Sequence, residues 1–280
     1  MEIRGANAVV TGGSRGIGPY IAKSLLARGA KVTLTARSAG DLELVERSFQ
    51  SNGHVASVAA DVNEAKDRRR IFEAAQESGP VDILVNNAGM EVLGRFPDFT
   101  PEDVHRIVTT NLESTIQMTL LAVPGMLERG HGQVVNIASL AGKVPLPYNS
   151  VYSATKFGLV GFSLSVRSEL RGTGVGVSVV CPGYVVEAGM YARHGEKKKP
   201  RAGSWTTPHK VGEAVAKAIE RDLAEILVCG VLPRLGDVML AISPRMTDSI
   251  ARRTGGYRPI QRNVEAAGKV DSTKTPPGAN

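Results

Sequence analysis

A tyrosine and a lysine stand four residues apart in the segment Tyr152-Ser153-Ala154-Thr155-Lys156. On a helix this spacing places both side chains on one face. A tyrosine hydroxyl has a pKa of about 10, and a neighbouring ammonium favours the phenolate and lowers that pKa. The pair makes Tyr152 a candidate for proton transfer: we hypothesise that it gives a proton to a carbonyl oxygen and takes the proton back in the reverse reaction.

A serine at the end of an apolar run completes this candidate catalytic group. Ser139 follows the predicted strand Val134–Ala138 and precedes Tyr152 by 13 positions. Its hydroxyl is expected to hydrogen-bond the same carbonyl oxygen and so fix the substrate. The end of this strand and the start of the tyrosine helix converge at the carboxyl edge of a parallel sheet, where such sheets bind ligands.

A glycine-rich turn predicts a dinucleotide site. The first predicted strand, Asn7–Gly12, runs into Thr11-Gly12-Gly13-Ser14-Arg15-Gly16-Ile17-Gly18, which opens a helix over Gly16–Arg28. Glycines allow the backbone to approach a pyrophosphate, and the positive end of the helix faces the same group. The residues expected to contact the cofactor here are Gly12, Ser14, Arg15, Gly16, Ile17 and Gly18.

The end of the second predicted strand indicates which dinucleotide binds. It reads Thr35-Ala36-Arg37-Ser38 and contains no acid. In dinucleotide folds an acidic residue at this point bonds the ribose hydroxyls of NAD, whereas a basic residue accepts the 2′-phosphate of NADP. Arg37 can pair with that phosphate bidentately, with Arg15 approaching from the other side. NADP(H) is therefore expected. The alternative is NAD(H), with Arg37 as a solvated charge.

Strand and helix patterns alternate along the whole chain to about residue 230. Such alternation predicts an α/β fold with a doubly wound, parallel seven-stranded sheet of the Rossmann type and helices on both faces. The strands are predicted at Asn7–Gly12, Lys31–Ala36, Val55–Asp61, Val81–Val85, Val134–Ala138, Val175–Val180 and Ile226–Val228, with helices at Gly16–Arg28, Asp41–Gln50, Glu64–Glu77, Pro101–Leu127, Val151–Arg171 and Pro208–Arg221. Residues 1–255 are expected to form a single domain, because these elements leave no room for a second one.

The chemistry-bearing segments occur in an order that resembles the short-chain dehydrogenase/reductase family. The turn reads TGxxxGxG rather than GxGxxG, and the tyrosine and lysine match the family's YxxxK. The resemblance extends over residues 5–230 and includes Asp61-Val62, Asn86-Asn87-Ala88-Gly89, Asn111, Ser139 and Pro182-Gly183.

The resemblance implies further roles for these residues. Asp61 and Val62 look like the pair that meets the adenine, and Asn111 falls where the family has a helix-kinking asparagine. Lys156 would also bond the nicotinamide ribose, and Asn111 would hold a water that links Lys156 to bulk solvent. The implied catalytic set is Asn111, Ser139, Tyr152 and Lys156; the further cofactor contacts are Asp61, Val62, Asn87, Ala88, Gly89, Tyr152, Lys156, Pro182 and Gly183. No metal is expected.

The sequence departs from the family after Pro182-Gly183. Glu187 stands where a threonine that contacts the cofactor is usual, and a carboxylate there would repel phosphate. Either Glu187 turns away or this segment is rearranged. Residues 187–207 are expected to cover the substrate, and their Met190, Tyr191 and Trp205 are candidates for lining an apolar pocket. The alternative is ordinary packing of this loop against its own domain.

The C-terminal part is additional to the smallest family members. Residues 231–255 read as one or two amphipathic helices broken by Pro244, which would cap the pocket, dock on a partner subunit or lie on a membrane surface. Pocket or subunit packing is favoured over peripheral membrane contact. Residues 256–280 are polar and are expected to be partly disordered.

Charge and composition narrow the class of protein. The formal net charge is +7, with basic clusters that include Lys197–Arg201, and these are interpreted as a solvated basic face. No nucleic-acid motif accompanies the charge, so no nucleic-acid partner is expected. The chain shows no signal peptide and no long apolar run, so a cytoplasmic location is expected.

These observations predict an NADP(H)-dependent oxidoreductase that interconverts a ketone and a secondary alcohol, on a lipid-like, acyl or alicyclic substrate. One alternative is a 3-oxoacyl-thioester reductase acting on an acyl carrier. An alternative from another class is a non-catalytic NADP(H)-binding sensor or regulator, against which the intact catalytic set argues. By analogy with the family, a homodimer or homotetramer is expected, since the helix Val151–Arg171 resembles the family's subunit-contact helix.

Overall fold

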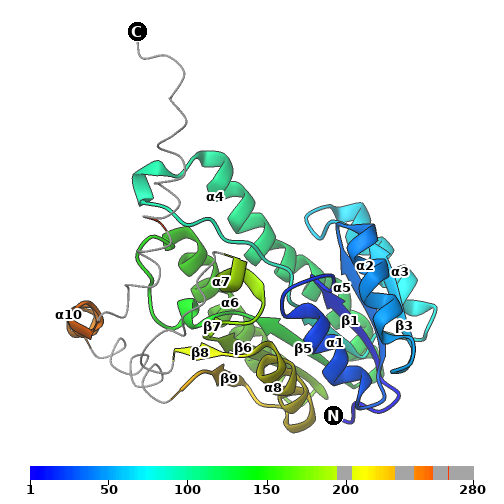
Figure 1. Ribbon diagram of the computed structural model, residues 1–280. Coiled ribbons are helices and arrows are strands. Elements are labelled where there is room, and N and C mark those ends of the chain that lie inside the picture. The colour runs from blue at the N-terminus through cyan, green and yellow to red at the C-terminus, as the bar shows by residue number, and fades with distance from the viewer. Residues whose placement is uncertain (194–203, 231–242, 255–263, 265–280) are drawn as a thin grey trace.

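The computed structural model describes residues 1–193, 204–230, 243–254 and 264. It confirms the α/β class: a seven-stranded sheet in the order β3-β2-β1-β4-β5-β6-β9, every neighbouring pair parallel (Figure 1). The strands are β1 (Asn7–Thr11), β2 (Lys31–Ala36), β3 (Val55–Ala59), β4 (Ile83–Asn86), β5 (Gly132–Ile137), β6 (Val175–Pro182) and β9 (Glu225–Val228).

Helices cover both faces of the sheet because side chains alternate along each strand. Ala8 and Val10 of β1 pack on one face, with α1 (Gly18–Leu26), α2 (Ala39–Phe49) and α8 (Pro208–Arg221). Val9 packs on the other face, with α3 (Ala65–Gln76) and α5 (Ser114–Arg129), where α6 (Ser150–Glu169) also packs against β6. Each fully buried Ile, Leu or Val contributes about 1.5–3 kcal/mol, so these two layers supply most of the stabilisation.

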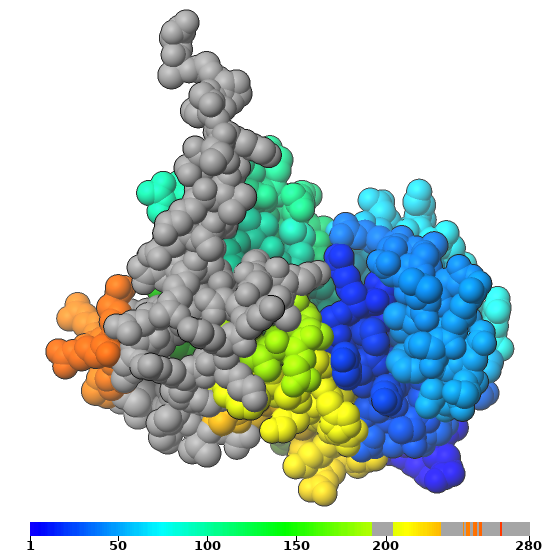
Figure 2. Space-filling model, in the orientation of Figure 1, coloured from blue at the N-terminus to red at the C-terminus, as the bar shows by residue number. Residues whose placement is uncertain are grey.

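Helices α1 and α8 lie side by side although they are distant in sequence (Figures 1 and 2). A Cβ on Gly212 of α8 would stand 2.5 Å from the Tyr20 carbonyl oxygen of α1, so the close approach requires glycine. Arg28 pairs with Glu213 at 2.8 Å and with Glu220 at 3.0 Å at the edge of this contact. Helix α1, which follows the glycine turn, is thereby fixed to α8, the helix that precedes the last strand of the sheet.

The predicted helix Pro101–Leu127 is divided in three. Helix α4 (Pro101–Val108) begins at a capping box between Thr100 and Asp103, as the sequence indicates. A π-helical turn, η2 (Thr109–Glu113), then separates α4 from α5. Asn111 lies in this turn, in agreement with the expected kink at that residue. A π turn inserts one extra residue into the helical ladder and is frequent at functional sites.

Several short elements were not expected from the sequence. They are the 3₁₀ turns η1 (Phe96–Asp98) and η3 (Leu140–Gly142), helix α7 (Gly189–Arg193), and a parallel ladder between β7 (Tyr184–Val185) and β8 (Trp205–Thr206). They are too short for a hydrophobic period to reveal. Strand β4 also begins at Ile83 rather than Val81.

Only part of the C-terminal segment for which the sequence made predictions falls within the described residues. Helix α10 (Pro244–Thr254) begins at Pro244, where a break was expected, because proline is favoured in the first turn of a helix. Residues 231–242, and all of 255–280 except 264, lie outside the described residues. Within the described part of the chain, no helix is both long and apolar enough to cross a membrane.

Candidate active site

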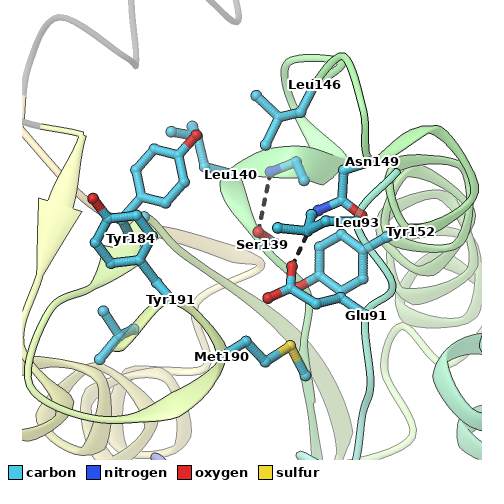
Figure 3. Close-up of a pocket in the computed structure, with 13 residues that line it drawn as sticks. Glu91, Leu93, Ser139, Leu140, Leu146, Asn149, Tyr152, Tyr184, Met190 and Tyr191 are labelled. Atoms are coloured by element: carbon cyan, nitrogen blue, oxygen red, sulfur yellow. Dashed lines mark hydrogen bonds between the residues drawn. The ribbon is translucent and has the colours of Figure 1, made fainter. Parts of the chain in front are cut away.

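The predicted catalytic side chains meet at the carboxyl edge of the sheet. Ser139 follows β5 and caps η3 by accepting a hydrogen bond from the Ala141 N–H at 3.1 Å. Tyr152 and Lys156 lie in the first two turns of α6, and Tyr152 bonds the Ser139 hydroxyl. Figure 3 shows Ser139 and Tyr152 on the same side of one cavity.

The pKa of Tyr152 is raised above its ordinary value. Burial is the main cause, the charge of Glu91 raises the pKa further, and the hydrogen bond with Ser139 lowers it. The sequence predicts a lowered pKa for Tyr152, whereas the net shift is upward, because burial is the largest effect. Near neutral pH, Tyr152 therefore carries its proton.

Lys156 is buried, and its ammonium donates a hydrogen bond of 2.8 Å to the Ile137 carbonyl oxygen at the end of β5. The ammonium nitrogen lies 5.5 Å from the centroid of the Tyr152 ring. Burial lowers the pKa of Lys156 to about 8. The lysine thus clamps α6 to β5 and places a positive charge behind the tyrosine ring.

Asn111 positions the chain that enters the pocket. Its side-chain carbonyl accepts the Met90 N–H at 2.8 Å, and its amide donates to the Met90 carbonyl at 2.8 Å and to Thr155 Oγ1 at 3.3 Å. The two amide hydrogens are committed to these contacts, whereas Oδ1 accepts one hydrogen bond and keeps a second lone pair. A water relay through Asn111 stays a prediction.

The cavity beside Tyr152 has a volume of about 90 Å³. The segment after Pro182 contributes Met190 and Tyr191, two residues that the sequence proposed as pocket liners, whereas Trp205 pairs with Tyr184 in the β7–β8 ladder and is not among the residues lining the cavity. Sequence reasoning missed other liners that no motif marks. They are Glu91, Leu93, Leu140, Ala141, Leu146, Asn149, Tyr184 and Val185.

An aromatic contact joins Tyr184 to Tyr191, near the start of the segment 187–207. The rings of Tyr184 and Tyr191 lie with centroids 4.9 Å apart and planes tilted by 49°. Such pairs contribute about 0.5–1.5 kcal/mol beyond the area they bury. The contact anchors α7 to β7 at the pocket wall.

The glycine turn has the shape that a pyrophosphate site requires. Gly12 and Gly16 have positive φ angles of 65° and 67°, and a Cβ on Gly18 would lie 2.2 Å from the Gly12 carbonyl oxygen. The N-cap of α1, Ile17, makes no side-chain hydrogen bond to the first turn. Pro19 has no N–H and the Tyr20 N–H donates to the Ile17 carbonyl at 3.1 Å, so the N–H groups expected to meet a ligand are those of Gly18 and the glycine turn before it. Ser14 and Ile17 are half-buried beside this opening.

Thr11, the first residue of the TGxxxGxG turn, joins that turn to the segment after β4. Its hydroxyl accepts the N–H groups of Asn87 and Ala88, both at 2.9 Å. The Asn87 amide donates to the Thr11 and Gly12 carbonyls, which leaves Asn87 Oδ1 buried without a partner in the protein. Gly89 lies beside Asn111 and Met190. The two predicted cofactor segments are thus brought together, with one acceptor still available to a ligand.

The two predicted phosphate-binding arginines are exposed at the same edge. Within the described residues, Arg15 and Arg37 have no ion pair or side-chain hydrogen bond. Val62 is buried, and Asp61 accepts the Asn63 N–H at 3.0 Å, which shapes the turn expected to meet an adenine. The glycine turn, the orphaned Asn87 oxygen and the two open cations together fit an NADP-type dinucleotide. His, Cys, Asp and Glu side chains within the described ranges form no group that could hold a metal ion.

Glu187 is exposed in the structure. Whether its carboxylate turns away from a bound cofactor or the segment is rearranged stays a prediction. Pro182 extends β6 by pairing with Val228, and a Cβ on Gly183 would stand 2.2 Å from the Ser204 carbonyl oxygen. Gly183 therefore lets β8 approach and also lines the cavity. The basic residues Lys197–Arg201 lie outside the described residues.

Comparison with known proteins agrees with the family resemblance of the sequence. The family described as short chain dehydrogenase matches residues 6–199. A ketoacyl reductase from Nostoc sp., HetN, is 39% identical over 270 residues, which cover 94% of this chain and 94% of that protein.

Two solved structures are similar over most of the chain. A metagenomic short-chain oxidoreductase in complex with NADP has a TM-score of 0.70 at 33% identity and covers 81% of this chain and 98% of its own. An actinorhodin polyketide ketoreductase variant with NADPH has a TM-score of 0.73 at 32% identity and covers 81% of this chain and 96% of its own. Structural relatives of this chain therefore bind NADP or NADPH.

The buried ammonium of Lys156 predicts a pH-dependent stability. Its pKa falls from 10.5 when unfolded to about 8 when folded, so between these values the unfolded chain binds more protons and stability rises with pH. Relative to Lys156→Met, the wild type should gain about 1–3 kcal/mol in free energy of unfolding from pH 8 to pH 10.5. Urea denaturation across this range measures the difference.

The matched control for this prediction is Lys66→Met, which removes an exposed lysine of α3. Its difference from the wild type should not change with pH. A Lys156→Met difference that is equally flat would contradict the depressed pKa.

Proposed function

Because the chain belongs to the short-chain dehydrogenase/reductase family, we propose that it is an NADP(H)-dependent ketoreductase that interconverts a ketone and a secondary alcohol. The observation that carries this proposal is the meeting of Ser139, Tyr152 and Lys156 beside one cavity. At this edge of the sheet, Tyr152 would donate the proton and the Ser139 hydroxyl would bind the carbonyl oxygen of the substrate.

Each side chain takes one part of the reaction. When bound beside these residues, the nicotinamide cofactor would supply the hydride for the carbonyl carbon. Tyr152 donates its phenolic proton to the carbonyl oxygen, and Ser139 hydrogen-bonds that oxygen and orients it. The Lys156 ammonium stabilises the phenolate that remains, since a positive charge near an oxyanion favours it. In the oxidative direction the phenolate accepts the proton of the alcohol.

The cofactor would be held by the segments that meet at the sheet edge. The N–H groups at the start of α1 would bond its pyrophosphate, and Asn87 Oδ1 offers an acceptor to its donor groups. The lack of an acid after β2 and the open side chains of Arg15 and Arg37 support NADP(H) over NAD(H).

The substrate is proposed to be a lipid-like, acyl or alicyclic ketone, since leucines and tyrosines form much of the cavity wall. A 3-oxoacyl-thioester reductase is the second candidate, supported by the similarity to a ketoacyl reductase. A panel of short and cyclic ketones compared with a panel of 3-oxoacyl thioesters separates the two. The non-catalytic alternative is not favoured, because the proton donor and its supporting groups are assembled.

Replacing Tyr152 with Phe tests catalysis directly. The change removes the proton donor and leaves the ring in place, so kcat should fall by about 10²–10⁴-fold, with NADPH binding retained. NADPH oxidation with the best ketone of the panel measures the first quantity, and nicotinamide fluorescence measures the second. Tyr20→Phe on α1 is the control and should keep the wild-type kcat. A kcat of Tyr152→Phe within tenfold of the wild-type value would contradict the proposed role of Tyr152.

Replacing Arg37 with Asp tests the cofactor preference. The change deletes a phosphate partner and adds a like charge, so NADPH should bind about a hundredfold more weakly, while NADH gains an acceptor for its ribose hydroxyls. Fluorescence titration with both dinucleotides gives the two dissociation constants. Arg69→Asp, at an exposed site on α3, should leave both constants unchanged. Wild-type protein that binds NADH as tightly as NADPH would refute the argument.

We also propose that the protein forms a homodimer or homotetramer through the face of α4, α5 and α6. Large apolar side chains are exposed on these helices: Val104, Val108, Leu120, Leu121, Leu127 and Phe157. An exposed apolar face of this extent is typical of an interaction surface.

A charge introduced into this face should separate the subunits. Leu120, 61% exposed, is replaced with Glu, because an unpaired carboxylate buried in an interface costs several kcal/mol. Light scattering on a sizing column should give a multimer for the wild type and a monomer for Leu120→Glu. Leu44→Glu on α2, where the side chain is 68% exposed, should not change the mass. A monomeric wild type would rule out the assembly.

A further inference from the structure

One tyrosine in the cavity wall takes no part in the reaction steps assigned above. Tyr184 follows Pro182-Gly183 and lines the same cavity as Ser139 and Tyr152. Figure 3 shows Tyr184 on the opposite side of the cavity from Tyr152. The hydroxyl oxygen of Tyr184 is buried, and it makes no hydrogen bond with the part of the chain that the structure describes.

The backbone of Tyr184 is held by two strands. Its N–H donates to the Ser204 carbonyl at 2.8 Å, and the residue pairs with Trp205 in the β7–β8 ladder. The N–H of Gly183, immediately before it, donates to the Val228 carbonyl of β9 at 3.2 Å. These bonds fix the point from which the tyrosine side chain extends.

The aromatic ring of Tyr184 is held as well. It packs on the ring of Tyr191, with the two centroids 4.9 Å apart. A tyrosine side chain has only two torsions that position its ring, so packing on one neighbour leaves it few other orientations. The hydroxyl therefore has a defined position on the wall and does not turn freely to find a partner elsewhere.

The Tyr184 hydroxyl is a hydrogen-bond donor at neutral pH. Burial raises the pKa of this phenol above its ordinary value, and the charges of Tyr191 and Glu91 raise the pKa further. The phenol consequently keeps its proton, and a neutral phenol can donate that proton to a carbonyl oxygen.

A buried hydroxyl without a partner destabilises the free protein. It has lost its hydrogen bonds to water and gained none in return, which costs about 1–3 kcal/mol. A phenylalanine at this position would pack on Tyr191 without that cost. The hydroxyl is best accounted for by a ligand that accepts its hydrogen bond.

The position of the hydroxyl restricts which ligand atom can reach it. Ser139 and Tyr152 lie across a cavity of about 90 Å³, so a ketone bonded to them lies within a few bonds of Tyr184. The same cavity is lined by Leu140 and Leu146, which offer only hydrocarbon. The acceptor is therefore a second oxygen of the substrate, a short distance along its chain from the ketone.

We propose that Tyr184 is a specificity-determining residue whose hydroxyl donates a hydrogen bond to a second carbonyl oxygen of the substrate. The proposal rests on the proposed function and adds a substrate class to it, namely short-spaced oxo esters and related acyl derivatives. A ketone that is otherwise hydrocarbon leaves the hydroxyl unpaired in the complex, and this penalty makes the site selective.

Two pairs of ketones of equal chain length test this selection. The holoenzyme is assayed with NADPH on ethyl 3-oxobutanoate against heptan-2-one, and on ethyl 4-oxopentanoate against octan-2-one. The ratio of kcat/KM, ester over ketone, is compared between wild type and Tyr184→Phe, so that the intrinsic reactivity of each substrate cancels. In at least one pair the ratio should fall about 3–15-fold in the variant, through slower use of the ester.

Thermal unfolding of the free protein separates this role from a structural one. Because no described residue bonds the hydroxyl, Tyr184→Phe should unfold at a temperature equal to or above that of the wild type. Tyr20→Phe on α1, at an exposed ring, should keep both substrate ratios. A lower unfolding temperature for Tyr184→Phe, or ratios that change less than threefold in both pairs, would overturn the inference while leaving the ketoreductase function intact.

A binding measurement keeps the inference separate from the proposed function. If the wild type reduces none of these ketones, the function fails on this panel, and calorimetric titration of the protein with NADP⁺ and the same ketones decides the inference. The oxidised cofactor cannot reduce them, so binding alone is measured. Tighter binding of an ester than of its matched ketone that is lost in Tyr184→Phe supports the role of Tyr184. The same preference in wild type and variant overturns it.

Discussion

The hydrogen bond from the buried Lys156 ammonium to the Ile137 carbonyl is the contact on which the active site depends. It joins α6 to the end of β5, two residues before Ser139 and one helical turn from Tyr152. Without it, the strand that carries the serine and the helix that carries the tyrosine would have fewer contacts to fix their separation. Burial of this charge carries a cost, which the lowered pKa of Lys156 expresses.

Other hydrogen bonds between buried side chains also join the strands and the helix that carry the site. Asn86 of β4 donates to Asn136 of β5 at 2.9 Å, and Asn136 donates to Ser163 of α6 at 2.9 Å. These side chains are buried, so losing one partner would leave an unpaired polar group and cost about 1–3 kcal/mol. Thr11 makes the equivalent connection between the glycine turn and Asn87. The sheet edge is therefore preorganised by hydrogen bonds, with the apolar layers as its support.

The electrostatics of the site depart from what residue types alone indicate. A lysine four residues from a tyrosine predicts a lowered tyrosine pKa, yet burial and Glu91 raise the pKa of Tyr152. Glu91 lies 61 positions before Tyr152, so nothing in the local pattern relates them. A raised pKa keeps the proton on Tyr152 near neutral pH and makes the phenol a weaker acid. Stabilisation of the phenolate is then needed only as the proton leaves.

The sequence by itself determined the order of strands and helices, the candidate catalytic tyrosine, lysine and serine, and the glycine turn, because these depend on local spacing and periodicity. It anticipated Asn111 as a kink and as the holder of a water, not as the anchor of Met90. The tertiary structure alone decided that Glu187 is exposed, that Thr11 joins two cofactor segments, and that Glu91 enters the cavity beside Tyr152. These features depend on contacts between residues far apart in the chain and on burial, which sets pKa values through solvation, and neither is encoded in a local pattern.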